Sequence, residues 1–348
     1  MAGIYFKAFV LQKDGEPFTC QDRIGIDLQK GRFSVADGVS NSFHPEIAAE
    51  AVTRAFITAE CDITEWENHF IDVASLQISD EWNREVNEIE SELDDFDSEH
   101  EKLQRQYLPS GASTFAGIEI NNVLHQIAFQ IAGDSCLFIL NENNPLQTYC
   151  SNPFEQRGDI RYCLFNNHTS AVAVGKYPEE LEWISGRTSI AKGYVMLMTD
   201  GAAKWFQDAV ITDKDVADQL WNLSSHQAFV DFVMSCRQQR QMDDDIAIIM
   251  LKFNEQWNGY AEPLIIDVWE WYPHDLLLLE QENTHPAVPE PTIVPESAIV
   301  PEDEIPEENS QEETGVIIAP IIQLSRFDKF VNAICKIWTK IFGRQVER

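Results

Sequence analysis

Residues 113–140 contain three apolar, strand-like segments, at 113–120, 123–131 and 136–140, with no room for a helix between them. Asn121 and Asn122 separate the first two, and asparagine pairs of this kind favour tight hairpin turns. Parallel neighbours need a crossover of a dozen or more residues, usually a helix. The segment therefore excludes a purely parallel sheet and predicts a meander of three adjacent antiparallel strands.

Three other stretches have apolar residues at helical spacing, namely 45–60, 66–107 and 213–240. Further strand-like runs lie at 5–11, 24–28, 33–36, 171–174, 194–198 and 246–253. Strands interleaved with helix pairs predict an α+β sandwich with helices outside. We expect the long charged stretch 66–107 to cap this sandwich, with a docking surface as the alternative.

The formal net charge of −33 excludes nucleic acid as a partner for most of the surface, because such a field repels polyanions. The seven cysteines form no CxxC pair, which speaks against a disulfide framework or a zinc site and favours a reducing compartment. The first residues lack a signal-peptide pattern, and no uncharged run is long enough to span a bilayer. We therefore expect a cytoplasmic protein.

The composition changes after residue 256 and divides the chain into three predicted parts: a domain at 1–256, a linker at 257–322 and a helix at 323–348. Within the linker, a six-residue repeat runs from 288 to 305, with proline at the second position of each copy. Recurrent proline excludes helix and central strand, and the acidic side chains repel one another. We expect a disordered, extended segment.

The last segment, 323–348, reverses the sign of the charge and has apolar residues on one helical face. A basic amphipathic helix can dock on a membrane surface or in the groove of a partner, which would make the protein peripheral to a membrane. The alternative is that this helix folds back onto the acidic body of the same chain.

Acidic residues lie at the ends of several of the predicted strands. Asp37 follows the strand at 33–36, Asp200 follows the strand at 194–198, and Asp244 precedes the strand at 246–253. Asp22 lies just before the strand at 24–28. Buried carboxylates are unfavourable unless they are paired, hydrogen-bonded or bound to metal, and oxygen ligands suit Mg²⁺ or Mn²⁺. The alternative for each is a simple turn, since Asp and Gly favour turns.

The order of these residues and of two further short motifs resembles the metal-dependent PP2C-type protein phosphatases over roughly residues 1–253. The motifs are Cys20-Gln21-Asp22-Arg23, Val35-Ala36-Asp37-Gly38, Gly111-Ala112-Ser113-Thr114, Ala132-Gly133-Asp134-Ser135, Met198-Thr199-Asp200-Gly201 and Asp244-Asp245-Ile246. Each is short, but six in order are hard to produce by chance. Their form is most similar to a divergent bacterial branch of the family.

This resemblance implies a PP2C-like β-sandwich with helices on both faces and two Mn²⁺ or Mg²⁺ ions at one end. By the match, Asp37 bridges the ions, the Gly38 carbonyl contacts one of them, and Asp200 and Asp244 hold the other. Asp22 lies at the edge and orients water. The implied reaction is hydrolysis of phosphoserine or phosphothreonine by a metal-bridging hydroxide. The implied partners are a phosphorylated protein substrate and the opposing Ser/Thr kinase.

Three departures from the family pattern bear on this expectation. The arginine that grips phosphate in many members is replaced by Pro17, and Lys13, Arg23 or Arg54 are the candidates to substitute for it.

An aspartate that joins Asp134 in holding a third metal is replaced by Lys204, whose charge would oppose another cation. We therefore expect two ions, with Asp134 in a hydrogen-bonding or accessory role. Asp245 stands where asparagine is common, so that Asp243 and Asp244 compete for one ligand role, and spacing favours Asp244. These departures leave a second hypothesis open, that of an inactive phosphoprotein-binding scaffold recruited through its C-terminal helix.

Overall fold

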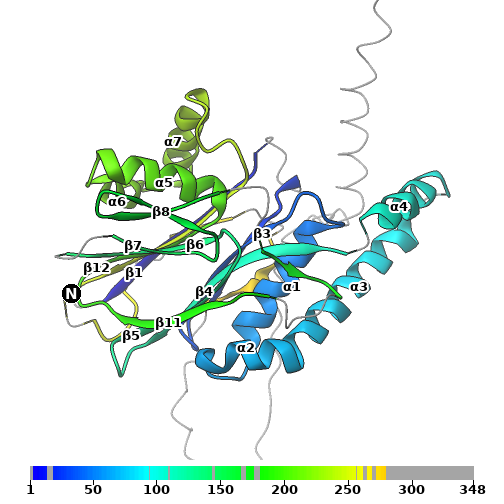
Figure 1. The fold of residues 1–348 in the computed structure, drawn as a ribbon, viewed down its shortest axis with the longest axis horizontal. Helices are drawn as coiled ribbons and strands as arrows, with labels where there is room; N and C mark the ends of the chain where they lie inside the picture. The colour runs from blue at the N-terminus through cyan, green and yellow to red at the C-terminus, as the bar shows by residue number, and fades with distance from the viewer. Residues whose placement is uncertain are drawn as a thin grey trace, which may run out of the picture. The chain divides into compact units, whose positions relative to one another are not determined.

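The computed structural model describes residues 3–13, 19–93, 95–108, 110–142, 146–165, 170–175, 181–255, 257–261, 265–268 and 272–279. Two β-sheets stack face to face in this part of the chain, and helices cover both outer faces (Figure 1). Helices α5–α7 lie on one side of the sandwich and α1–α4 on the other. The expected α+β sandwich of mainly antiparallel sheets is confirmed.

The first sheet has the strand order β14-β1-β13-β12-β6-β7. Its strands are β14 (Ile265–Asp267), β1 (Ile4–Leu11), β13 (Ile246–Phe253), β12 (Gly193–Met198), β6 (Cys136–Asn141) and β7 (Gln147–Tyr149). All of its pairs are antiparallel except β14 with β1.

The second sheet has the order β11-β5-β4-β3-β2-β15, and β10 also pairs with β4. Its strands are β11 (Ile184–Ser189), β5 (Gln126–Ala132), β4 (Ala112–Asn121), β3 (Arg32–Gly38), β2 (Asp22–Asp27), β15 (Leu277–Leu278) and β10 (Val172–Ala173). All of its pairs are antiparallel except β15 with β2. A separate hairpin joins β8 (Phe154–Arg157) to β9 (Ile160–Cys163).

The predicted three-strand meander is only partly right. β4 and β5 pair as expected, but β6 belongs to the opposite sheet, where it pairs with β12 and β7. The chain changes sheets at Gly133, whose φ of 92° lies in the left-handed region that favours glycine. The turn between β4 and β5 is also longer than predicted, and the Asn121 side chain accepts hydrogen bonds from the Val123 and Leu124 amides within it.

The helical segments follow the predicted stretches with three additions, at residues 63–65, 200–212 and 274–276. They are α1 (Pro45–Thr58), η2 (Ile63–Glu65), α2 (Trp66–His69), η3 (Phe70–Ala74), α3 (Ser75–Glu92), α4 (Asp95–Tyr107), α5 (Asp200–Thr212), α6 (Val216–Trp221), α7 (His226–Gln238) and η5 (His274–Leu276). Sequence analysis missed α5, and the stretch 213–240 is two helices. The second of them begins at an N-cap, Ser225, whose side chain accepts a hydrogen bond from the Ala228 amide.

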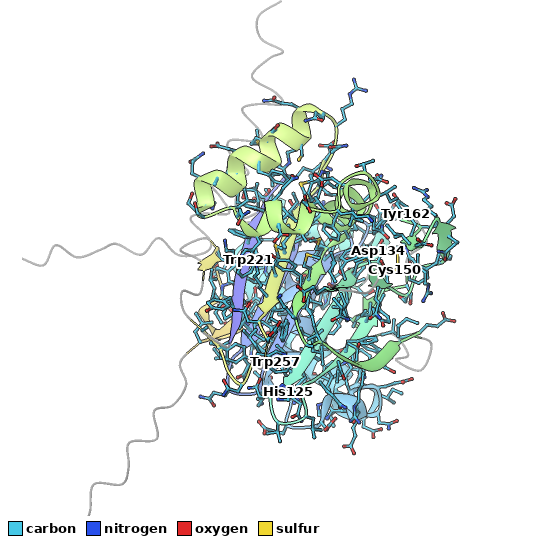
Figure 2. The ribbon with its side chains drawn as sticks, turned by 90° about the vertical axis from the view of Figure 1, so that its left-hand side faces the viewer. His125, Asp134, Cys150, Tyr162, Trp221 and Trp257 are labelled. Carbon is cyan, nitrogen blue, oxygen red and sulfur yellow. A yellow bond between two sulfur atoms is a disulfide. The ribbon has the colours of Figure 1, made fainter. Side chains whose placement is uncertain are left out.

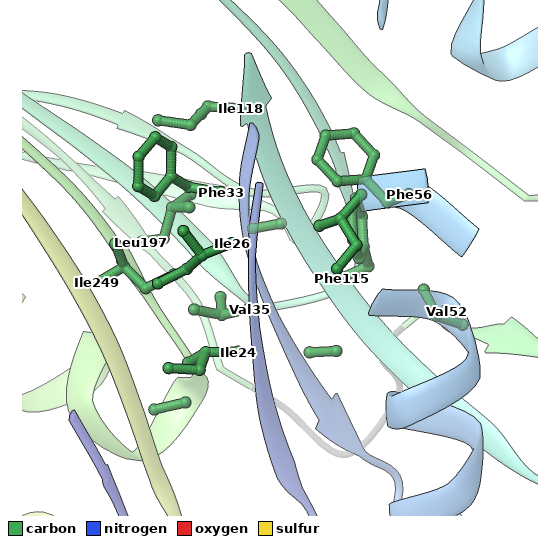
Figure 3. Packing of buried hydrophobic residues seen from close by; sticks show 14 of the residues in the cluster. Ile24, Ile26, Phe33, Val35, Val52, Phe56, Phe115, Ile118, Leu197 and Ile249 are labelled. Carbon is green, nitrogen blue, oxygen red and sulfur yellow. The ribbon is translucent and has the colours of Figure 1, made fainter. Parts of the chain in front are cut away.

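Alternation along the strands divides the core into two layers. Ile24, Ile26, Phe33 and Val35 point between the sheets toward the first sheet (Figure 3). Gly25 points the other way, where a Cβ atom would lie 2.4 Å from the Thr53 side chain of α1. Helix α1 can therefore lie close against the second sheet.

The structured part of the chain continues beyond residue 256, where we expected the linker to start. The compact unit reaches Glu280, and β14 and β15 add a parallel strand to each sheet. Tyr272 is buried, and its hydroxyl donates a hydrogen bond of 2.7 Å to the Ile24 carbonyl. The hexapeptide repeat and the basic segment 323–348 lie outside the described residues.

Within the described residues, none of the helices has the length and apolar character that crossing a membrane requires. Cys150 and Cys163 form a disulfide, which sequence analysis did not expect. These cysteines are 13 residues apart and follow no motif. They meet because the β8–β9 hairpin returns the chain to β7.

Candidate metal centre

Asp22 and Asp37 lie side by side on two adjacent strands of the second sheet. Asp22 opens β2 and Asp37 lies near the end of β3, and the antiparallel register makes them direct partners. Directly opposed residues in such a pair have Cβ atoms about 5 Å apart. Two carboxylates at this spacing repel each other unless a proton or a cation lies between them.

The end of β12 connects the first sheet to this pair. The Thr199 hydroxyl donates a 2.6 Å hydrogen bond to Asp22 Oδ2, and the hydroxyl oxygen of Thr199 accepts a hydrogen bond of 2.9 Å from the Ala247 amide. Thr199 and Asp22 are both buried, with exposed fractions of 0% and 1%. The side chain of Thr199 therefore fixes the position of Asp22 relative to β13.

Asp200 and Asp244 approach the pair from the first sheet. Asp200 is the first residue of α5, directly after Thr199, and Asp244 lies just before β13. A Cβ atom on Gly201 would lie 2.6 Å from the Asp245 carbonyl oxygen and 3.1 Å from Asp244 Cβ. Glycine at 201 thus allows the start of α5 to contact the segment that carries Asp244.

The electrostatics show that these carboxylates form one cluster. Burial raises the pKa of Asp22 and of Asp37 well above the ordinary value, and neighbouring carboxylates raise each further. Burial also raises the pKa of Asp200 to about 7, with Asp134 and Asp244 adding to the rise. In the absence of a cation, the cluster therefore favours protons on several of its carboxyl groups.

Asp134 belongs to the cluster as well. It lies in the Gly133 corner between the sheets, is 7% exposed, and raises the pKa of both Asp37 and Asp200 by charge repulsion. The next residue, Ser135, forms a buried 2.7 Å hydrogen bond with the Thr114 hydroxyl on β4. This contact fixes the corner on the second sheet.

Sequence analysis missed the part that Asp245 plays. Its two carboxylate oxygens accept hydrogen bonds from the Lys13 amide at 2.6 Å and the Gln21 amide at 2.7 Å. Asp245 thereby connects the end of the segment that follows β1 to the residue that precedes β2. Asp243 and Asp244 are both exposed, and the charge of Asp244 raises the pKa of Asp37 and of Asp200. No short motif distinguishes these three neighbours.

Of the three candidate cations, two are engaged in structural contacts. Arg23 is buried and donates to the carbonyls of Cys20 and Asp22, both at 2.9 Å. Arg54 pairs with three carboxylates, which are Glu50, Glu81 and Asp275.

Lys13 remains a candidate to bind phosphate. Its ammonium group lies 3.5 Å from Asp244, and its side chain is 43% exposed. Lys204 is exposed on α5, and its charge acts to lower the pKa of Asp200. Pro17 lies outside the described residues.

The residues present fit hard divalent cations. The donors are carboxylate oxygens, and their raised pKa values reflect negative charge that lacks a counterion. Among the described residues, no three carboxylates have oxygens all within 4.8 Å of one another. That spread suits ions that keep several water ligands and take only one or two carboxylates each, as Mg²⁺ does.

The protein phosphatase 2C family model matches residues 12–250, which is more than half of the chain and contains every carboxylate of the cluster. The chain belongs to the protein phosphatase 2C family. No curated protein matches the sequence.

Several solved phosphatase structures are similar to the chain. One is the catalytic domain of the serine/threonine phosphatase PstP in complex with two manganese ions, at 11% identity and a TM-score of 0.47, covering 73% of this chain and 100% of that one. PppA of Pseudomonas aeruginosa has 16% identity, a TM-score of 0.42, and coverage of 72% and 98%. Stp1 of Staphylococcus aureus has 13% identity, a TM-score of 0.41, and coverage of 73% and 95%.

Proposed function

We propose that the protein is a metal-dependent protein serine/threonine phosphatase. The observation that carries this proposal is the group of buried carboxylates, contributed by both sheets, whose pKa values are raised by burial and mutual repulsion. A family member that needed no cation would gain stability by replacing them with apolar or amide side chains. Their presence supports a bound cation and therefore catalysis.

The proposed ligands are Asp37, the Gly38 carbonyl, Asp200 and Asp244, which would hold two Mn²⁺ or Mg²⁺ ions. The manganese in the PstP structure belongs to that protein and supports the choice of metal here. When bound, two such ions neutralise phosphate charge and lower the pKa of water. Asp134 takes an accessory role, because Lys204 lies beside Asp200 and opposes a third cation.

Asp22 would orient the water for attack on the phosphorus atom. Its Oδ2 is occupied by the Thr199 hydroxyl, and a hydrogen bond also joins it to Asp37. These two hydrogen bonds fix the Asp22 carboxylate beside Asp37. A group that is already held in position loses little entropy when the transition state forms, which lowers the barrier to reaction.

Lys13 binds the phosphate of the substrate in place of the missing arginine. It is the one of the three candidate cations that keeps an exposed ammonium group at the cluster. An ammonium is a point charge without the two-pronged geometry of guanidinium, so we expect weaker phosphate binding than an arginine would give.

The test uses the purified full chain with Mn²⁺ and a phosphothreonine peptide. We expect phosphate release that requires the metal and is abolished in Asp37→Asn, while circular dichroism of that variant stays native. Asp208→Asn is the matched control, since Asp208 is on the far part of α5 and bonds Tyr162. An inactive wild-type protein with Mn²⁺ bound would overturn the proposal.

A phosphoprotein-binding scaffold is the second candidate. The positive charge of Lys204 next to Asp200 favours it, because a cation there competes with metal. Calorimetric titration with Mn²⁺ separates the two functions. A scaffold gives no tight binding, whereas the phosphatase gives two sites.

We also propose partners and a location for the protein. A cytoplasmic phosphatase would act on phosphoproteins made by an opposing Ser/Thr kinase, and segment 323–348 would recruit it to a membrane surface or a partner groove. Flotation with anionic vesicles tests the recruitment. Loss of flotation after truncation at residue 280 supports it, and equal flotation of both chains contradicts it.

A further inference from the structure

Three cysteine sulfurs lie together beside the acidic cluster. The Sγ atoms of Cys136, Cys150 and Cys163 are all within 4.8 Å of one another, and the residues are 0%, 2% and 0% exposed. They come from three separate segments: the start of β6, the residue after β7, and the end of β9. The other described cysteines form no such group.

The backbone around this cysteine cluster is held by specific hydrogen bonds. The Ser151 hydroxyl accepts from the Gly133 amide at 2.5 Å, and the Gly133 carbonyl accepts from the Ser151 amide at 2.9 Å. The Cys163 amide donates to Gln207 Oε1 at 2.6 Å, which attaches β9 to α5. Figure 2 labels Cys150 beside Asp134, in agreement with these contacts. The three sulfurs therefore sit on a fixed frame.

We propose that the reduced cysteine cluster is a second metal site, one that binds a soft divalent cation such as Zn²⁺ through three thiolates. Zinc–sulfur bonds of about 2.3 Å in a tetrahedron place the sulfurs roughly 3.8 Å apart. Sulfurs already within 4.8 Å of one another reach that spacing by side-chain rotation. Thiolates prefer soft cations, whereas the neighbouring carboxylates prefer hard ones, so the two sites take different metals.

The disulfide and the bound cation exclude each other, because Cys150 and Cys163 supply the same sulfurs to both. Reduction by a phosphine or a dithiol breaks the S–S bond and adds two electrons and two protons, giving two thiols. Cation binding then displaces the protons of the thiols to solvent and forms metal–sulfur bonds. The structure shows the oxidised form, in which Cys136 is the one member of the cysteine cluster that keeps its thiol.

The test is a titration of the reduced, full-length protein with Cd²⁺, followed by ultraviolet absorption. Thiolate ligands give a ligand-to-metal charge-transfer band, and carboxylate ligands give none, so the acidic cluster is invisible in this measurement. We expect a band that saturates at one tightly bound Cd²⁺. It should be lost in the oxidised protein and in Cys136→Ser, and retained in Cys236→Ser, a buried cysteine that lies outside the group.

The reduced wild-type protein decides the result even where a variant fails to fold. If all seven thiols are titratable after denaturation and native protein still shows no charge-transfer band, the cysteines are core packing and the proposal is overturned. A band of equal strength in folded Cys136→Ser overturns it as well. We expect Asp37→Asn to keep the charge-transfer band, because the cysteine cluster does not depend on Asp37. The result of this test is therefore independent of whether the protein is a phosphatase.

Discussion

The Thr199 hydroxyl donates a 2.6 Å hydrogen bond to Asp22 Oδ2, and the two residues belong to different halves of the sandwich. Thr199 directly follows β12 of the first sheet, and Asp22 opens β2 of the second. They are 177 residues apart in the chain. This contact aligns the edges of the two sheets where the carboxylates gather, and it acts to lower the pKa of Asp22 against the effect of burial.

Replacing Thr199 with valine should weaken this alignment. Thr199→Val leaves a buried carboxylate without its donor and the Ala247 amide without its acceptor, and we expect a loss of about 1–3 kcal/mol in the free energy of unfolding. Urea unfolding of the metal-free protein measures it. Thr199→Ser keeps the hydroxyl and should stay near wild type. Equal losses in both variants would show that packing of the methyl group, rather than the hydrogen bond, matters.

Adjacent aspartates should differ in their effect on metal affinity. Asp244 raises the pKa of Asp37 and of Asp200 by charge repulsion, although the side chains of Asp243 and Asp244 are both exposed. We expect Asp244→Asn to weaken Mn²⁺ binding at least about tenfold, because fewer ligand charges lower the affinity of such sites. Asp243→Asn is the matched control and should bind as the wild type does, as measured by calorimetry. A larger loss of Mn²⁺ affinity in Asp243→Asn than in Asp244→Asn would show that Asp243 is the ligand.

Lys13 should affect substrate binding more than turnover. We expect Lys13→Ala to raise KM for a phosphothreonine peptide about tenfold, the equivalent of one charge-assisted hydrogen bond, with little change in kcat. Lys13→Arg keeps the charge and adds the two-pronged guanidinium, so its KM should be at or below the wild-type value. Lys192→Ala is the control, since Lys192 is 42% exposed, close to the 43% of Lys13, and pairs with Glu142. An unchanged KM in Lys13→Ala would remove Lys13 from phosphate binding.

The stability of the metal-free protein should depend on pH through Asp200. Its pKa is about 7 in the folded chain and 3.8 ordinarily, so between these values the folded state holds a proton that the unfolded state has released. The free energy of unfolding therefore falls as pH rises through this window, by up to about 4 kcal/mol for this group. The asparagine introduced by Asp200→Asn does not titrate, so the free energy of unfolding of this variant lacks this dependence on pH. Urea unfolding in EDTA from pH 4 to 8 should show the two curves diverging, and parallel curves would contradict the prediction.

His44 gives a second pH dependence at higher pH. It lies between Glu101 at 2.5 Å and Glu46 at 3.1 Å, and it joins the start of α1 to α4. Burial opposes protonation, but the hydrogen bonds with Glu101 and Glu46 outweigh burial and raise the pKa of His44 to about 9. This stabilisation is complete below the ordinary value of 6.5 and is lost as pH rises through 9.

We expect the difference in unfolding free energy between wild type and His44→Asn to shrink by roughly 3 kcal/mol from pH 6 to 10. Asparagine tolerates the left-handed backbone of residue 44, whose φ is 47°, so the comparison isolates the charge. Thermal unfolding of the metal-free proteins provides the measurement. A constant difference across this range would show that His44 is neutral in the folded protein.

Local patterns were sufficient to predict most strands and the mainly antiparallel character of the sheets. Alternation and turn residues are local properties, and they placed β1, β3, β4 and β13 correctly. The same patterns did not predict that the chain crosses to the other sheet at Gly133, because the sheet that a strand joins depends on the distant strands with which it pairs. They also failed at α5, where Asp200 and Gly201 resemble a turn but begin a helix.

The sequence by itself determined the family, the candidate carboxylates and their order along the chain, because these depend only on residue types and spacing. Only the tertiary structure brought the charge of Asp244 near Asp37 and Asp200 and that of Asp245 near Asp22, and it showed that Arg23 and Arg54 are engaged in structural contacts. It also brought Asp245 to the Lys13 and Gln21 amides and three cysteines to one another. These relationships join residues as much as 232 positions apart, such as Lys13 and Asp245, and spacing along a chain carries no information about such contacts.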